Sequence, residues 1–272
     1  MPFLRSQICF NARVKYYPGS SEPCEIIIAD ENIFNPSGVE LLEDKKDISS
    51  GGTSKNNQSE LSPSMRSFAR ARRRAYDLIR CNPELNAFIT LTFNKEQIDR
   101  TSYTAIIKEL SVWLDNRVRR KGLKYILCPE HHKDGEGIHF HGLMNLDSLK
   151  LENSGHKRKG KVVYNISDFN FGFTTVLRIT GENSVEACAG YIFKYMSKQC
   201  QQKIGGRYYL SGGDLSEPRY EYFNVDPSRY TDIPATPLQG VSGGVRVAYG
   251  EKIRDLTISG MLKEMGICEV NL

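Results

Sequence analysis

Apolar and polar positions along the chain follow two different periods, which predict strands and helices between residues 64 and 204. Residues 88–93 combine β-branched and aromatic side chains and are typical of a strand. Over residues 96–120 the apolar side chains recur at helical spacing. The same reasoning predicts strands at residues 123–130, 138–145, 162–166 and 171–179, and helices at residues 64–80 and 183–199.

The order strand, helix, hairpin, strand, helix favours an α+β fold, an antiparallel sheet with helices mainly on one face. The other face is then free to carry a binding site. We expect this domain to span residues 64–204, beginning with a basic helix. Around it we expect an N-terminal extension of unknown role (1–43), a polar linker or loop (44–63) and a loop-rich C-terminal segment (205–272) with a short helix near 252–265.

The composition excludes several classes of protein. With 39% hydrophobic and 25% charged residues, the 272-residue chain is typical of a globular protein. It contains no run of about 20 apolar residues that could cross a bilayer, and no apolar signal core follows its first residues. Its seven cysteines form no Cys-x-x-Cys pair, which argues against a disulfide framework or a zinc ribbon. We therefore expect a cytoplasmic protein.

The net charge of +5 is modest, but the basic residues are clustered. One cluster lies on the predicted first helix, at Arg66, Arg70, Arg72, Arg73 and Arg74. A second cluster lies at the end of the helix predicted for residues 96–120, between Arg117 and Lys124. A third comprises Lys157, Arg158, Lys159 and Lys161. Each cluster alone is compatible with ordinary solvated surface. Together they favour contacts with the phosphates of a nucleic acid.

Four of the five histidines fall between residues 131 and 141. His139 and His141 are separated by one residue on a predicted strand, so their side chains point to the same face and can bind one metal ion. Glu130, on the preceding strand, is the first candidate for a third ligand and His132 is the second. Two imidazoles and a carboxylate suit Mn²⁺ or Mg²⁺, while Zn²⁺ stays an alternative.

A tyrosine pair lies about fifty residues later, in Tyr191-Ile192-Phe193-Lys194-Tyr195-Met196-Ser197-Lys198. Tyr191 and Tyr195 are neighbours on one helix face, at the edge of its apolar stripe, with Lys194 and Lys198 next to them. They could be rim residues with a packed ring and a wet hydroxyl. Beside a metal-bound phosphate they could instead be nucleophiles that cut DNA and keep it as a phosphotyrosine, assisted by the lysines.

These residues resemble the motifs of the HUH endonuclease superfamily, above all the two-tyrosine rolling-circle replication initiators of small single-stranded DNA phages and related mobile elements. The likeness covers about residues 66–200, in the family's order: the strand at 88–94, the segment from Glu130 through His139-Phe140-His141, and the helix from Tyr191 to Lys198. It implies an HUH fold with a ferredoxin-like or RRM-like core, with His139, His141 and Glu130 as metal ligands.

The resemblance also implies a function. Tyr191 and Tyr195 would be the nucleophiles, helped by Lys194 and possibly Lys198, in metal-dependent nicking and rejoining of single-stranded origin DNA. Single-tyrosine members exist, so Tyr195 could be dispensable. No helicase segment or phosphate-binding loop is present in the sequence, which implies a host helicase and polymerase as partners in a bacterial cytoplasm. A relaxase or transposase with the same chemistry, and a non-catalytic DNA-binding replication regulator, stay as alternatives.

Overall fold

The computed structural model describes residues 9–36, 63–132, 135, 137–181, 184–198, 203–237, 243–250 and 252–253. Almost all of the expected linker at 44–63 and of the expected helix near 252–265 lies outside these residues. The chain divides into two compact units, Gln58–Glu217 and a second unit made of Met1–Asn57 and Pro218–Leu272. The second unit thus joins the two ends of the chain, which the sequence analysis treats as separate segments.

The unit Gln58–Glu217 is built on one antiparallel sheet with the strand order β6-β7-β8-β3-β5-β4-β9. Its strands are β3 (Ala87–Phe93), β4 (Tyr125–His131), β5 (Ile138–Met144), β6 (Leu151–Arg158), β7 (Lys161–Ile166), β8 (Gly172–Arg178) and β9 (Leu210–Gly212). Its helices are α1 (Pro63–Cys81), α2 (Tyr103–Lys121) and α3 (Ser184–Lys198). This arrangement confirms the predicted α+β fold.

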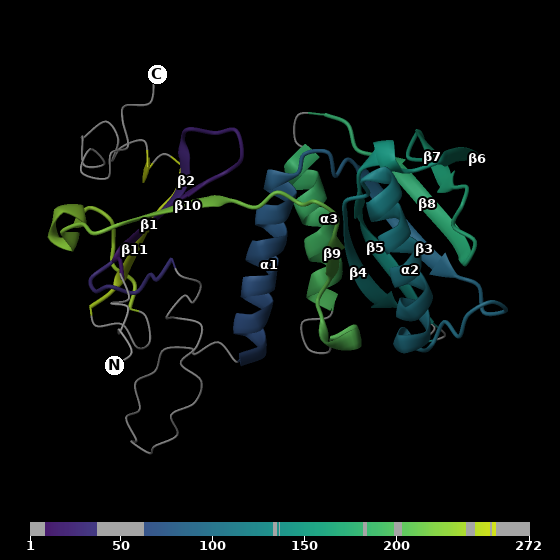
Figure 1. Ribbon diagram of the computed structural model, residues 1–272, viewed down its shortest axis with the longest axis horizontal. Helices are drawn as coiled ribbons and strands as arrows, with labels where there is room; N and C mark the ends of the chain where they lie inside the picture. The colour runs from purple at the N-terminus through teal and green to yellow at the C-terminus, as the bar shows by residue number, and fades with distance from the viewer. Residues whose placement is uncertain are drawn as a thin grey trace, which may run out of the picture. The chain divides into compact units, whose positions relative to one another are not determined.

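The helices cover both faces of this sheet (Figure 1). Buried residues of α2, such as Leu110 and Leu114, share a core with Leu91 of β3 and Phe140 of β5. On the opposite face, α3 packs against β4 and β5, and α1 lies beside α3 and contributes to the same apolar cluster. Two helices do share one face, as expected, but α2 packs on the other, so the face that was expected to be free is covered by a helix. None of the described helices is both long and apolar enough to span a membrane.

Most predicted elements are present, with shifted ends. Helix α2 begins at Tyr103, seven residues after the predicted start, because Ser102 caps it by accepting a hydrogen bond from the backbone N–H of Ala105. Strand β6 was not predicted. Its side chains are polar and largely exposed, so it lacks the alternation that reveals a half-buried strand.

The second unit holds a four-stranded antiparallel sheet in the order β10-β1-β2-β11. Its strands are β1 (Ala12–Tyr16), β2 (Pro23–Ala29), β10 (Arg219–Phe223) and β11 (Val245–Ala248). Val14, Ile26, Ile28 and Tyr230 form the centre of its core. Strands from residues 12–29 and 219–248 therefore complete each other, which gives the N-terminal extension a structural role.

Candidate metal centre and tyrosine pair

The hairpin formed by β4 and β5 brings three potential metal ligands together. Glu130 of β4 lies directly opposite His139 of β5, and Cys128 lies opposite His141. Opposite residues of an antiparallel pair project to the same face, and here that face is the one covered by α3. The structure therefore places the Glu130 carboxylate beside both imidazoles, as predicted from the sequence.

The three donor atoms form a compact triangle. Glu130 Oε2 lies 2.9 Å from His141 Nε2 and 3.2 Å from His139 Nε2, and the two Nε2 atoms are 3.1 Å apart. Ligands about 2.1 Å from an octahedral cation are about 3.0 Å from their neighbours. The triangle thus matches one face of an octahedron, and this Glu-His-His cluster can hold a metal ion with positions left for a substrate.

The protonation states also suit a cation. Burial lowers the pKa of His141 to about 3, with a further contribution from His139, and burial likewise lowers the pKa of His139. Burial opposes ionisation of Glu130, but the ammonium of Lys198 and the imidazole of His139 outweigh it, so the pKa of Glu130 is lowered. At neutral pH the cluster therefore offers two neutral imidazoles and one carboxylate, the forms that bind metal ions.

The Nδ1 atom of each imidazole has a partner behind the triangle. His139 Nδ1 lies 3.1 Å from His132 Nε2, and His141 Nδ1 lies 3.3 Å from Tyr191 Oη. Tyr191 Oη donates to the backbone carbonyl of Ile89 at 3.2 Å, so it is able to accept from His141 in the tautomer that carries the proton on Nδ1. That tautomer leaves the lone pair of Nε2 for a cation. His132, the second candidate for a ligand, thus lies behind His139, outside the triangle.

Tyr195 lies against the metal centre. Its ring stacks on the imidazole of His141, with centroids 3.8 Å apart and planes 11° apart. The ammonium groups of Lys194 and Lys198 lie 5.3 and 5.1 Å from the centre of the Tyr195 ring. Lys198 also forms an ion pair with Glu130. Tyr195 is only 8% exposed, so it belongs to the buried apolar stripe of α3. The sequence had predicted a position at the edge of that stripe.

Tyr191 lies deeper, one helical turn before Tyr195. Its ring stacks on Phe88 with a centroid distance of 4.3 Å. Burial raises the pKa of Tyr191, the neighbouring Tyr195 adds to this effect, and the guanidinium of Arg158 acts in the opposite direction. Burial therefore keeps the Tyr191 hydroxyl protonated at neutral pH.

The predicted basic residues occupy two exposed surfaces. On α1 the side chains of Arg66, Arg70, Arg72, Arg73 and Arg74 are all exposed. Arg72 lies over the ring of Phe193 and Arg74 pairs with Glu217. Lys157 and Arg158 end strand β6 and Lys159 lies in the following turn with a positive φ. This third cluster therefore lies at the tip of the hairpin formed by β6 and β7.

One side chain that contacts the metal centre, Thr90, was not predicted from the sequence. Thr90 of β3 lies opposite His141, and its Oγ1 is 3.1 Å from His141 Nδ1. The threonines at 90 and 92 were recognised only as strand-forming residues. Their alternation with apolar residues was the available signal, because it puts them on the face of β3 away from α2.

A known protein family matches the segment of the chain that holds this centre. Residues 86–200 match the sequence model of the family Replication-associated protein ORF2/G2P. The matched segment runs from β3 to the end of α3 and contains every residue of the metal centre and the tyrosine pair. No curated protein and no solved structure matches the chain. The family match supports a replication-associated protein.

Proposed function

We propose that this protein initiates rolling-circle replication by nicking and rejoining single-stranded origin DNA through a 5′-phosphotyrosine, as HUH endonucleases do. The observation that carries the proposal is the stacking of Tyr195 on His141, one of three clustered metal-binding side chains. A nucleophile, a cation site and two lysines thus converge on one point. The match to replication-associated proteins over the same residues supports the same conclusion.

In the proposed reaction, the hydroxyl oxygen of Tyr195 attacks the scissile phosphorus. The bond between phosphorus and the 3′ oxygen breaks, the phenol loses its proton, and the 3′ oxygen gains one and leaves as a hydroxyl. The 5′ phosphate stays on Tyr195. One phosphodiester replaces another, so the step is reversible and needs no nucleotide. A divalent cation such as Mn²⁺ or Mg²⁺, held by Glu130, His139 and His141, would polarise the phosphate.

The lysines next to Tyr195 favour its attack. The phenol oxygen loses its proton as it attacks, and nearby positive charge stabilises the negative charge that develops in the transition state. Lys194 and Lys198 provide positive charge, with their ammonium groups 5.3 and 5.1 Å from the centre of the ring. Lys198 also holds Glu130 and thereby links the nucleophile helix to the metal-binding hairpin.

The two tyrosines receive different roles in this proposal. We assign the first cleavage to Tyr195, because its ring lies on a ligand and beside both lysines. The hydroxyl of Tyr191 is bound to Ile89 and His141, where it orients the imidazole. Tyr191 serves a second cleavage, after a round of synthesis, only when its hydroxyl leaves these contacts. Synthesis itself needs a host helicase and polymerase.

The test is a covalent-adduct assay. The protein is incubated with labelled single-stranded DNA from its own replicon, in Mn²⁺ or in EDTA, and run on a denaturing protein gel beside Tyr195→Phe, Tyr191→Phe and the double variant. A metal-dependent protein–DNA band that Tyr195→Phe removes supports the proposal. Intact DNA binding without a band in Mn²⁺, with an origin that replicates in cells, contradicts it and favours a replication regulator.

A further inference from the structure

One row of side chains crosses the sheet on the face of the metal centre. Glu130 lies opposite His139, His139 opposite Thr92, and Thr92 opposite Phe173 of β8. Opposite residues project to the same face, so the ring of Phe173 lies on the metal-binding side. Neighbouring strands are about 5 Å apart, which puts the Phe173 backbone about 10 Å from that of His139.

Phe173 is unusually exposed for its position in a strand. Its side chain is 55% exposed, whereas Thr174 and Val176, which face α2, are 3% and 0% exposed. Burying an apolar ring is favourable, so an exposed ring beside a polar centre suits contact with a flat apolar ligand. Nucleobases are such ligands, and aromatic side chains commonly stack with them in sites for single-stranded nucleic acids.

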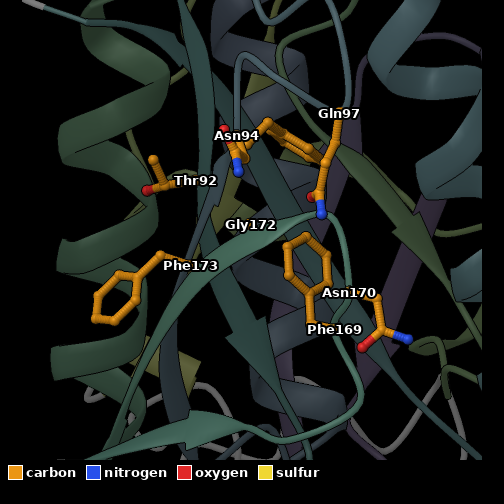
Figure 2. Close-up of a pocket in the computed structure, with 8 residues that line it drawn as sticks. Thr92, Asn94, Gln97, Phe169, Asn170, Gly172 and Phe173 are labelled. Carbon is orange, nitrogen blue, oxygen red and sulfur yellow. The ribbon is translucent and has the colours of Figure 1, made fainter.

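A groove of about 330 Å³ begins at this ring and continues past Gly172. It is lined by Thr92, Phe93, Asn94, Gln97, Phe169, Asn170, Gly172 and Phe173. Figure 2 shows Thr92 and Phe173 on one side of Gly172, and Gln97 and Asn170 on the other. A Cβ on Gly172 would lie 2.2 Å from the backbone oxygen of Thr92, so glycine is required where β8 starts against β3.

The chemistry of the groove fits single-stranded DNA. The amides of Asn94, Gln97 and Asn170 offer both donors and acceptors, as base edges do. The hairpin of β6 and β7, which pairs with β8, carries the exposed cations Lys157, Arg158 and Lys159, and such positive charge suits the phosphates that link successive bases. Apolar surface is confined to the rings of Phe173, Phe169 and Phe93, of which the last two are largely buried. A narrow aromatic platform with polar neighbours favours nucleotides over a protein partner.

We infer that this groove binds the DNA next to the scissile phosphate. The base of a flanking nucleotide stacks on Phe173, and the strand continues over Gly172 toward the amides of Gln97 and Asn170. The inference rests on the proposed function, because it takes single-stranded DNA to cross the metal centre. It adds a binding subsite that the metal ligands and tyrosines do not provide.

The test compares Phe173→Ala with Phe173→Trp in EDTA, where metal-dependent cleavage is absent. The probe is a short fluorescein-labelled oligothymidylate, and its dissociation constant is measured by fluorescence anisotropy. Phe173→Ala is expected to weaken binding about 5- to 100-fold, the loss typical of one base–aromatic stack. Phe173→Trp should bind within about twofold of wild type, because the stacking surface is kept. Val112→Ala, which changes an exposed side chain on α2, is the matched control.

A second probe separates stacking from a structural effect. On an abasic deoxyribose-phosphate oligomer of the same length, wild type and Phe173→Ala should bind equally, since no base is present to stack. If wild type binds oligothymidylate and Phe173→Ala binds it equally well, the subsite is wrong while the nicking proposal stands. An equal loss on both probes also overturns the subsite. If wild type binds neither probe, the proposed function fails together with the subsite.

Discussion

The two faces of the seven-stranded sheet are built from the same strands but differ in chemistry. Under α2, the alternate residues of β3 and β5 are apolar and form one continuous core with Leu110. On the α3 face, the intervening positions are apolar at one end of the strands, as at Leu143 of β5. At the other end they are polar, as at His139 of β5 and Thr92 of β3. The α2 face is thus apolar throughout these strands, whereas the α3 face combines an apolar core at one end with the candidate metal centre at the other.

This division explains how a partly buried cluster of metal-binding side chains fits into a stable sheet. Side chains alternate between faces of a strand, so a change on one face leaves the other face largely in place. The histidines replace core positions on the α3 face, and their surroundings lower the pKa of both. The α2 face compensates with a well-packed apolar core. The following predictions test how far stability and activity are separated between the two faces.

The largest effect is expected for Tyr195→Phe on the α3 face. Loss of the hydroxyl removes the proposed first nucleophile, and covalent-adduct formation should fall by a factor of about 10³ or more. Tyr191→Phe should cause a smaller loss, because it removes an orienting hydrogen bond to His141. Initial rates on origin DNA measure both. The reverse ranking would show that Tyr191 performs the first cleavage.

On the α2 face, Leu110→Ala should change stability and leave the chemistry of the site intact. Leu110 is fully buried, and removing a buried leucine side chain typically costs about 2–5 kcal/mol. Urea unfolding should show this loss, while metal affinity of the folded protein stays within about threefold of wild type. Val112→Ala on the exposed side of α2 is the control and should change stability by no more than about 0.5 kcal/mol. If Leu110→Ala kept its stability but lost metal affinity, the idea that the α2 face affects stability and the α3 face affects metal binding would be wrong.

A smaller effect is expected behind the metal ligands. His132→Ala removes the partner of His139 Nδ1, and such orienting partners typically contribute about 10- to 100-fold to metal affinity. Calorimetric titration with Mn²⁺ measures the loss. His131→Ala is a matched control, since His131 is exposed. If His132→Ala abolished binding as completely as His139→Ala, then His132 would be a ligand.

The smallest effect concerns acid stability. Burial holds the pKa of His141 at about 3 in the folded protein, against about 6.5 when unfolded. Between these values the unfolded chain binds the extra proton, so this group makes stability fall as the pH drops from 6.5 toward 3. Over the single pH unit from 6.5 to 5.5 this loss is about 1 kcal/mol, so in EDTA the melting temperature of wild type should fall by a few degrees more than that of His141→Gln. Parallel curves would mean that His141 is accessible to water in the folded state.

Local pattern was sufficient for much of this fold. The residues of β3, β5 and β8 alternate or carry β-branched and aromatic side chains, and the structure confirms these strands within a residue or two. Strand β6 could not be predicted in this way, because its side chains are polar and lack the alternation of apolar and polar residues. Its strand conformation depends on hydrogen bonding to β7. The joining of β1 and β2 with β10 and β11 also left no local signal, since it depends on contacts between the two ends of the chain.

The sequence by itself determined which side chains can take part in the candidate site. His139 and His141 share a face because side chains of a strand repeat every two residues. Tyr191 and Tyr195 share a face because an α-helix has about 3.6 residues per turn. Only the folded sheet shows that Glu130 lies in the donor triangle and that His132 contacts His139 from outside it. It also shows that Phe173 lies in the same cross-strand row as Glu130, His139 and Thr92. The physical reason is that strand register depends on turn geometry and packing across the sheet, which no local period encodes.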